Sequence, residues 1–380
     1  MAEPIRILQV FALMNKGGAE TMIMNFYRNI DRSKIQFDFI VHSQEECDYD
    51  KEIRALGGNI YNIPRYTGKN HFQFKMAWQN FFKEHTEYKI IHGHVRSTAS
   101  IYLKIAKKYG LITIAHSHST SSGNGASALV KNILQYPIRH TADYLFACSK
   151  VAGNWLFGKG ASKRGNFVVL NNAIETKKFA YNERLRITKR RELQLENKFV
   201  IGHIGRFITP KNHKLLIDIF KEIHDISPNA VLLLIGEGEL KKSIVNKVND
   251  MGLSNSVIFT GVRSDISELL QAMDVFLFPS LYEGLPVTLI EAQASGLKIF
   301  ASNTITEEVF ITDLVNYCSL KSTPNEWANR VLNGFDENIN RSRSFTEVKS
   351  SNYDIEENAK WLENFYLNIY VNSKKGVNNG

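Results

Sequence analysis

Short apolar runs alternate with longer amphipathic stretches along almost the whole chain. In the first half, the pattern predicts β-strands at residues 5–10, 36–41, 58–62, 89–92, 111–115, 143–147 and 166–170. Helices are predicted between them, for example at residues 19–30, 72–82, 97–109 and 131–140. This alternation is typical of βαβ units, in which helices cover both faces of a parallel sheet.

The same pattern then starts again and predicts a second domain. Strands are predicted at 199–205, 230–235, 256–260, 274–278 and 298–301, with helices beginning near His213, Leu240, Asp265 and Pro286. Residues 175–198 hold ten charged side chains between Lys177 and Glu196 and are predicted to be a linker. The expected fold class is α/β, with doubly wound Rossmann-like domains at 1–174 and 199–352 facing across a cleft. An amphipathic helix at 353–371 follows them.

Composition indicates a cytoplasmic protein. No apolar run approaches the roughly 20 residues that a membrane span needs, and the first ten residues carry charges that do not suit a signal peptide. Three cysteines, at positions 47, 148 and 318, are isolated and lack metal-ligand spacing. A reducing compartment is therefore expected.

The net charge of +9 comes from the first half of the chain. Residues 1–175 hold 22 Lys and Arg against 13 Asp and Glu, whereas the rest holds 25 of each kind. Because no nucleic-acid-binding motif accompanies this charge, nucleic acid is disfavoured as a partner. An anionic membrane surface at the inner face of the plasma membrane, or a phosphate-bearing lipid acceptor, is favoured over an ordinary solvated surface.

The segment 280–296 carries the most specific chemistry in the chain. An apolar strand leads into a turn, after which Pro286 is expected to open a short helix that Gly296 closes. Glu283 lies in the turn, and Glu291 lies on the helix among apolar neighbours. A buried carboxylate is costly unless donors satisfy it, and vicinal sugar hydroxyls are such donors. The pair therefore indicates a sugar-binding site.

Two further features of this half suit a diphosphate. Free amides at the helix start, just after Gly284 and Leu285, favour an anion. A second strand, turn and helix start at residues 200–213 places Arg206 at a strand end and Lys211 one short loop later. Fixed cations would stabilise the charge that a departing nucleotide diphosphate gains. Together these features predict a site for a nucleotide sugar.

A glycine pair gives a weaker signal in the first half. Gly17 and Gly18 follow the first strand and open a helix. Paired glycines let backbone amides approach an oxyanion closely, although such pairs are also common in turns. The sequence alone leaves both interpretations open.

Two His-x-His pairs end predicted strands of the first half, at His92 and His94 and at His116 and His118. One interpretation is a metal site made of four imidazoles. It is disfavoured, because no carboxylate lies near either pair in the sequence. The preferred hypothesis is that one imidazole, His116, binds the transferred sugar or its phosphate. An ordinary hydrogen-bonded histidine remains the alternative.

Taken in order, these motifs resemble the GT-B retaining glycosyltransferases of family 4. The resemblance rests on the Gly17-Gly18-Ala-Glu20 turn, on Arg206 with Lys211, on the Glu-x7-Glu spacing of Glu283 and Glu291, and on the run Asn171-Asn172-Ala-Ile-Glu, which is similar to the family's interdomain segment. It spans nearly the whole chain. Within the family, the motifs look most like bacterial exopolysaccharide or capsule enzymes of the EpsF type.

The resemblance implies a role for each position. Four residues become catalytic candidates, namely His116, Glu283, Arg206 and Lys211. The donor-binding candidates are Gly17, Gly18, Arg206, Lys211, Val262, Arg263, Glu283, Gly284, Leu285, Pro286 and Glu291. By this resemblance the two cations bind the donor diphosphate, Glu283 lies by the sugar hydroxyls, and Glu291 holds the ribose hydroxyls. Residues 262–263 meet the base through their backbone.

The family also implies a mechanism, namely transfer with retention of anomeric configuration and without a metal or other cofactor. His116 would lie near the anomeric centre, although His118 fits the family's histidine position equally well. The leading hypothesis is transfer of a hexose or N-acetylhexosamine from a UDP-sugar to a polyprenyl-diphosphate-linked glycan. A nucleotide-sugar epimerase or hydrolase, and a non-catalytic sugar-nucleotide-binding assembly subunit, are the alternatives. The loop 119–126 is expected to select the sugar and the acceptor.

Overall fold

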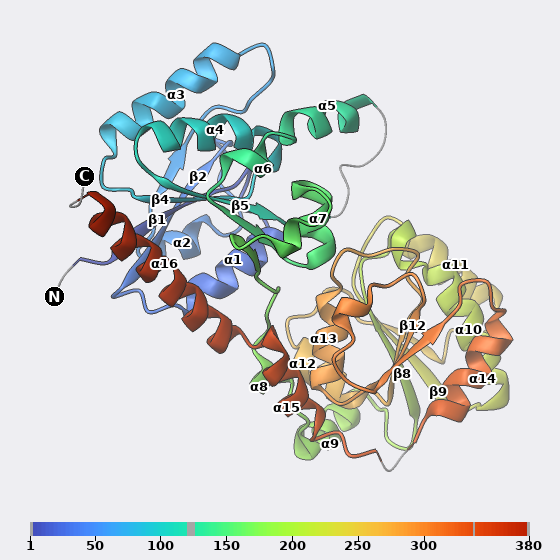
Figure 1. Cartoon of the computed structure of the whole chain (residues 1–380). Helices are drawn as coiled ribbons and strands as arrows, with labels where there is room; N and C mark the ends of the chain where they lie inside the picture. Colours follow the sequence, from blue (N-terminus) through green and yellow to red (C-terminus); the bar gives the residue numbers. More distant parts are fainter. Residues whose placement is uncertain (1–2, 120–125, 337–338, 378–380) are drawn as a thin grey trace. The chain divides into compact units, whose positions relative to one another are not determined.

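The computed structural model describes residues 3–119, 126–336 and 339–377. Residues 120–125, in the loop expected to select the acceptor, lie outside the described part. Contacts divide the chain into two compact units, Met1–Ala173 with Ile355–Gly380, and Ile174–Asp354 (Figure 1). Each unit is built around one parallel sheet, so both are doubly wound α/β structures.

The first unit has a seven-stranded sheet in the order β3-β2-β1-β4-β5-β6-β7. Its strands are β1 (Ile5–Val10), β2 (Ile35–Val41), β3 (Ile60–Asn62), β4 (Ile90–Gly93), β5 (Ile112–Ser117), β6 (Tyr144–Ala147) and β7 (Phe167–Val169). The order changes direction between β1 and β4, which pair side by side. The loops that follow these two strands therefore diverge, and this opening is where such sheets bind ligands.

Helices cover both faces of this sheet. They are α1 (Gly18–Asn29), α2 (Asp50–Ala55), α3 (His71–Glu84), α4 (Arg96–Lys108), α5 (Ala126–Gln135), α6 (Ile138–Thr141), α7 (Lys150–Phe157) and α16 (Ile355–Val377). The single helix expected at 131–140 is wrong: α5 and α6 are separate, because Pro137 between them cannot donate a backbone hydrogen bond.

The last helix, α16, packs on α1 of the first unit. Its buried side chains Leu362, Tyr366 and Ile369 recur at helical spacing and join the core around β1 and β2. The helix continues to Val377, beyond the predicted end at 371.

The second unit has a six-stranded sheet in the order β10-β9-β8-β11-β12-β13. Its strands are β8 (Phe199–Ile204), β9 (Ala230–Ile235), β10 (Val257–Phe259), β11 (Val275–Phe278), β12 (Lys298–Ser302) and β13 (Val315–Cys318). Its helices are α8 (Thr176–Phe179), α9 (Glu183–Glu192), α10 (His213–Ile226), α11 (Lys241–Asp250), α12 (Ile266–Ala272), α13 (Val287–Ala294), α14 (Pro324–Gly334) and α15 (Ser344–Val348). Strand β13 was not predicted, because this edge strand is only half-buried and mixes polar with apolar residues.

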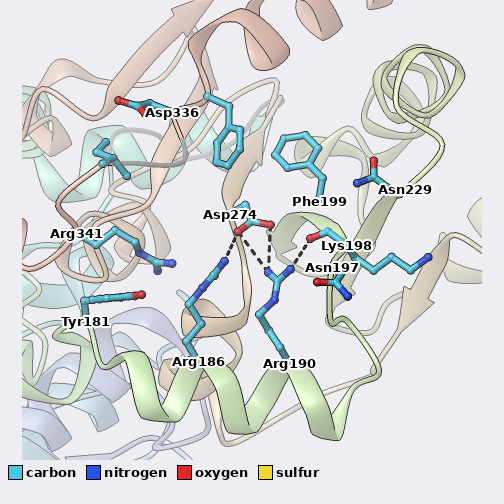
Figure 2. A pocket seen from close by; sticks show the side chains of 12 residues that line it. Tyr181, Arg186, Arg190, Asn197, Lys198, Phe199, Asn229, Asp274, Asp336 and Arg341 are labelled. Atoms are coloured by element: carbon cyan, nitrogen blue, oxygen red, sulfur yellow. Dashed lines mark hydrogen bonds and ion pairs between the residues drawn. The ribbon is translucent and has the colours of Figure 1, made fainter.

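The residues expected to form a linker, 175–198, are grouped with the second unit and include α8 and α9. Arg186 and Arg190 of α9 both bind the carboxylate of Asp274, just before β11 (Figure 2). The buried Lys189 forms ion pairs with Asp265 and Glu268 at 3.1 and 2.8 Å. Part of the charge run in the predicted linker therefore belongs to the face of α9 that packs on the second unit.

Within the described ranges, no helix combines the length and the apolar character that a membrane span requires.

Gly296 ends the turn after α13 in a conformation that only glycine adopts easily. Its φ is +69°, and a Cβ there would lie 2.6 Å from the Cα of Arg341. Gly252, after α11, has the same φ of +70° but no atom within 4 Å of the corresponding position. The two glycines thus differ in crowding alone.

This difference gives a stability prediction. Gly252→Ala should cost about 1 kcal/mol, because only the left-handed conformation is strained. Gly296→Ala should cost at least about 2 kcal/mol more, because the backbone of Arg341 must also move. Urea unfolding of both variants beside the parent protein would measure this. Equal midpoints for the two variants would show that the crowding at Gly296 has no energetic effect.

Candidate functional site

The loops after β8 and β11 form one structure at the carboxyl ends of these two central strands. The short 3-10 helix η2 (Thr209–Lys211) lies in the first loop. The backbone N–H of Leu281 donates to the carbonyl of Pro210 at 2.8 Å, and the Asn212 side chain donates to the carbonyl of Pro279 at 3.1 Å. The two segments that the sequence analysis singled out for a nucleotide sugar are therefore held together at the point where the strand order changes direction.

Lys211 and Glu283 are an ion pair in this site. Lys211 Nζ lies 2.8 Å from Glu283 Oε1, and each side chain is 15% exposed. The ammonium also lies 4.7 Å from the centre of the Phe278 ring, a cation–π distance. The angle does not suit a hydrogen bond, so Glu283 Oε1 is left without a hydrogen-bonding partner among the described residues. Sequence analysis named both residues but did not predict that they pair.

Gly205 allows the Lys211 side chain to cross the end of β8. A Cβ at this position would lie 2.9 Å from His203 Nε2 and 3.1 Å from Lys211 Cδ. Arg206, the next residue, is exposed, and within the described part of the chain no hydrogen bond or ion pair engages its side chain. One cation of the site is therefore paired and the other is free to bind an anion.

The loop after β11 is anchored before it opens toward solvent. Ser280 is fully buried, and its carbonyl accepts hydrogen bonds from the hydroxyls of Ser302 (2.5 Å) and Thr304 (3.1 Å). Gly284 has open space where a side chain would stand. Pro286 precedes α13 as its N-cap in extended conformation, and no side chain caps the helix. The first amides of α13 are therefore not occupied by a side-chain cap.

Glu291 lies on α13 between apolar neighbours. Leu289, Ile290 and Ala292 are fully buried, whereas Glu291 itself is half-buried. Burial raises the pKa of its carboxyl from 4.5 to about 7, and Lys178 opposes this shift. No described side chain donates a hydrogen bond to it. Its charged form is thus left for a ligand to stabilise.

Val262 and Arg263 follow β10, two strands away from β8, at the same edge of the sheet. Val262 is 78% exposed. The Arg263 guanidinium is tied to Asp265 by hydrogen bonds of 2.8 and 2.7 Å. The backbone of this turn is the part that remains accessible, and the carbonyl of Gly261 holds it to β9 by accepting from the Gly236 N–H at 2.9 Å.

In the first unit, a cavity of about 240 Å³ opens at the carboxyl ends of β1, β4 and β5. Gly17 is the N-cap of α1, and Glu20 folds back over it, so that a side chain at Gly17 would overlap the Glu20 carboxyl. Burial raises the pKa of this carboxyl, and the Glu20 backbone N–H bonds to it. The oxyanion position predicted at the glycine pair is therefore occupied by the protein's own carboxylate. Gly18 has open space around it.

The four histidines of the two His-x-His pairs cluster at this cavity, which His94, His116 and His118 line. His92 Nε2 lies 3.1 Å from His116 Nδ1, and His94 Nδ1 lies 2.7 Å from His118 Nε2. The rings of His116 and His118 are stacked at 4.0 Å. Ligand atoms of His92, His94 and His116 all lie within 4.8 Å of one another, so the metal alternative is geometrically open. Both nitrogens of His92 and of His94 are, however, engaged in hydrogen bonds.

Residues outside the predicted set complete this cluster. Gln9 on β1 and Tyr366 on α16 are fully buried and bind His94 and His92, at 2.9 and 2.7 Å. A buried glutamine in a strand of apolar residues is a detectable signal, since a buried amide needs partners. Tyr366 gave no signal, because it follows His92 by more than 270 positions and looks like a core residue of an amphipathic helix.

A larger cavity, of about 360 Å³, lies elsewhere in the second unit (Figure 2). Its lining includes Phe199, Asn229 and Asp274, which stand at the amino-terminal side of β8, β9 and β11. The buried Arg341 donates there to the carbonyls of Ser295, Met273 and Leu270. Because its arginines already bind protein groups, this cavity is structural and is not the candidate site.

Two family models match the chain. The family model of Glycosyltransferase Family 4 matches residues 16–178, and that of Glycosyl transferases group 1 matches residues 186–347. The protein named glycosyltransferase EpsF of Bacillus subtilis (strain 168) is 34% identical over 368 residues, which cover 95% of this chain and 96% of that protein. A UDP-Gal:alpha-D-GlcNAc-diphosphoundecaprenol alpha-1,3-galactosyltransferase of Escherichia coli is 35% identical over 139 residues, 36% of each chain.

The fold has close counterparts among solved structures. Anabaena HepE in complex with UDP superposes with a TM-score of 0.77 at 16% identity, covering 96% of this chain and 100% of that one. At this identity the likeness concerns the fold alone. The two family matches and the full-length relative carry the assignment. The chain therefore belongs to the family 4, group 1 glycosyltransferases and is a glycosyltransferase with the GT-B fold.

Proposed function

We propose that the protein transfers a hexose or an N-acetylhexosamine from a UDP-sugar to a polyprenyl-diphosphate-linked glycan in exopolysaccharide or capsule biosynthesis. The proposal includes retention of anomeric configuration and independence from metal. The observation that carries it is the Lys211–Glu283 pair beside the unpaired Arg206, at the point where the strand order changes direction. This is the place where a doubly wound sheet binds a nucleotide.

The donor diphosphate suits the two cations. Lys211 is held by one carboxylate, and a diphosphate would offer more negative charge at the same place. When Lys211 turns to the phosphate, Glu283 becomes free to accept hydrogen bonds from the sugar hydroxyls. The charge on the diphosphate grows as the glycosidic bond breaks, so Arg206 and Lys211 stabilise the transition state more than the ground state.

The rest of the donor is assigned to neighbouring groups. The ribose hydroxyls would donate to the half-buried carboxylate of Glu291, and the backbone at 262–263 would meet the base. The amides at the start of α13, with the backbone of residues 284–286, would support the sugar and phosphate. The choice of UDP is supported by two of the proteins above: the Escherichia coli enzyme uses UDP-Gal by its name, and HepE was solved with UDP.

The first unit supplies the remaining groups. Gly17 and Gly18 would approach a phosphate oxygen once Glu20 moves aside, and His116 would lie near the anomeric centre with its Nε2 unpartnered. Metal independence is supported by the hydrogen bonds that already engage both nitrogens of His92. Retention is carried over from the family.

A lipid-linked acceptor fits the surface of the first unit. Near α5 and α6, Val130, Ile133 and Tyr136 are 55%, 65% and 57% exposed. Lys131 lies among them in the sequence, and the basic surplus of the chain belongs to this half. Apolar side chains flanked by cations favour the surface of an anionic membrane. The E. coli relative acts on a diphosphoundecaprenol-linked sugar by its name.

Donor binding can be measured by thermal unfolding against UDP-, GDP-, ADP- and TDP-sugars. At about 100 times its dissociation constant, the right donor should stabilise the protein by roughly 2.7 kcal/mol, which for this size is a shift of about 2 °C or more. Arg206→Ala and Glu291→Ala should lose the shift. Arg184→Ala and Glu183→Ala, exposed residues on α9, should keep it. A shift retained in the two site variants would place the nucleotide elsewhere.

The raised pKa of Glu291 predicts a pH dependence. The folded protein holds this proton more tightly than the unfolded chain, so its contribution to stability is lost as pH rises from about 4.5 to about 7. A ribose that donates to the carboxylate favours the charged form. UDP-glucose should therefore bind up to about 10-fold more tightly at pH 8 than at pH 6, with release of protons.

UDP-glucose is the appropriate ligand because both of its phosphates are esterified and do not titrate near pH 6, unlike a terminal phosphate. Calorimetry in buffers of different ionisation enthalpy would count the released protons. In Glu291→Gln the affinity should be lower and independent of pH. An unchanged pH slope in that variant would assign the titration to another group.

Transfer itself can be followed with radiolabelled UDP-sugars and a polyprenyl-diphosphate sugar in vesicles. Lys211→Met should lower kcat/KM by about 100-fold, because the leaving diphosphate loses a cation. Lys241→Met, which breaks a surface ion pair with Glu237 in the same unit, should have no effect. Release of free sugar without acceptor, faster than transfer, would favour the hydrolase alternative. Equal rates on anionic and neutral vesicles would remove the argument for membrane contact.

A further inference from the structure

The four clustered histidines of the first unit are linked through a single side-chain amide. Gln9 Oε1 lies 2.9 Å from His94 Nε2, and Gln9 Nε2 donates to the Tyr366 hydroxyl at 3.4 Å. Tyr366 in turn lies 2.7 Å from His92 Nδ1. Gln9 therefore stands at the head of two hydrogen-bonded chains, which end at His118 and His116.

The protonation of the first chain follows from the amide oxygen. An amide oxygen can only accept, so the His94 nitrogen that faces it carries the proton. The other nitrogen of neutral His94, Nδ1, is then bare and accepts from His118 Nε2–H. This leaves His118 Nδ1 without a proton. That atom is buried and has no hydrogen-bonding partner among the described residues.

In the second chain the hydrogen bonds run in the opposite direction, because Gln9 donates where it accepted in the first chain. The amide nitrogen of Gln9 donates to the Tyr366 oxygen, which leaves the phenolic hydrogen for His92 Nδ1. Burial raises the pKa of Tyr366, so the phenol keeps this hydrogen. His92 then carries its proton on Nε2 and donates to His116 Nδ1. His116 consequently carries its own proton on Nε2, an atom that is also buried and unpartnered.

We propose that Gln9 holds both His116 and His118 in the Nε2–H tautomer through hydrogen-bonded chains of opposite polarity, so that the cavity is offered one N–H donor, His116 Nε2, and one lone-pair acceptor, His118 Nδ1. Gln9, His92, His94 and Tyr366 are the positioning residues. If the amide were turned over, both chains would reverse together and the two roles would still be opposite.

A donor and an acceptor on stacked rings form a site for a hydroxyl group. The two rings lie 4.0 Å apart, and a single sugar hydroxyl can accept from His116 and donate to His118. Desolvation lowers the pKa of both imidazoles, so neither ring adds a charge to the cavity near neutral pH. This assignment rests on the proposed function, in which the ligand is a sugar. It also gives both histidines a role where the motif suggested a choice between them.

The tautomers can be read directly in the full-length protein. Two-bond proton–nitrogen NMR spectra of the histidine-labelled protein separate protonated from bare ring nitrogens, and His116→Gln and His118→Gln assign the two sets of signals. The parent protein should show a proton on Nε2 of both histidines, so that His116 presents N–H and His118 presents a bare Nδ1. The same kind of atom facing the cavity on both residues would overturn the proposal.

Two variants test the role of the chain. In Gln9→Glu both side-chain oxygens accept, so Tyr366 should donate to the new carboxylate and His116 should lose its Nε2 proton while His118 is unchanged. Tyr366→Phe should make the His116 tautomer mixed, again with His118 unchanged, and lower kcat by at least about 10-fold with little change in KM. If the buried carboxylate of Gln9→Glu prevents folding, Tyr366→Phe still tests the chain. Tyr88→Phe, another buried hydroxyl of this unit, is the matched control.

The NMR signals and the transfer rate separate the tautomer proposal from the proposed transferase function. The NMR signals do not depend on turnover, so a protein without transferase activity would still report its tautomers. A normal rate with the predicted tautomers lost in Tyr366→Phe would show that the polarity is unimportant for the reaction. Unchanged His116 signals in Tyr366→Phe would show that the chain does not fix the tautomer.

Discussion

A parallel sheet covered by helices on both faces leaves only its two ends open to solvent, and this constraint decides where each unit can do chemistry. In both sheets the strand order changes direction at the centre, between β1 and β4 and between β8 and β11. Loops leaving the carboxyl ends of those strands run apart and cannot fill the space above them. The candidate groups lie at or beyond the carboxyl ends of β1, β4, β5, β8, β10 and β11, whereas the larger cavity at the opposite end of the second sheet is lined by arginines that bind the protein itself.

Three charged groups of the candidate sites have partners that satisfy them only in part. Lys211 is paired with Glu283, Glu20 covers the amino end of α1, and burial raises the pKa of Glu291 to about 7 against the opposing charge of Lys178. Each arrangement costs less than an isolated buried charge but satisfies the group incompletely. A ligand with phosphates and hydroxyls offers these groups better partners.

Periodicity located the strands because both sheets are buried on both faces, so nearly every strand is a continuous apolar run. It failed at β13, where Asn316 and a half-buried tyrosine belong to an edge strand, and at 131–140, where Pro137 separates two helices. It assigned the charged segment 175–198 to a linker and did not predict that Arg186 and Lys189 of α9 meet acidic partners that are distant in the sequence. Pairing of this kind cannot be seen from one segment alone.

The candidate site was limited in the same way, because contacts between distant segments could not be predicted. Arg206, Lys211, Glu283 and Glu291 could be found because strand ends and helix starts are local features. The contact between Lys211 and Glu283 could not, since it depends on which strands are neighbours. The link from Gln9 through Tyr366 to His92 joins the first strand to the last helix, and only the folded unit reveals it.

The two units solve the electrostatic problem of glycosyl transfer in different ways. In the reaction proposed here, the cations of the second unit would face the group that gains negative charge, so that charge is met by charge. In the first unit, four imidazoles are packed together without a carboxylate bonded to any ring, and burial keeps them neutral. A charged imidazole close to the anomeric carbon would oppose the positive charge that develops there, whereas a neutral ring can bind a hydroxyl without that penalty.

Neutrality, however, leaves each ring two possible tautomers. A cluster that relies on neutral histidines therefore needs a separate device to choose between them, and a buried amide with fixed donor and acceptor ends is the simplest one available.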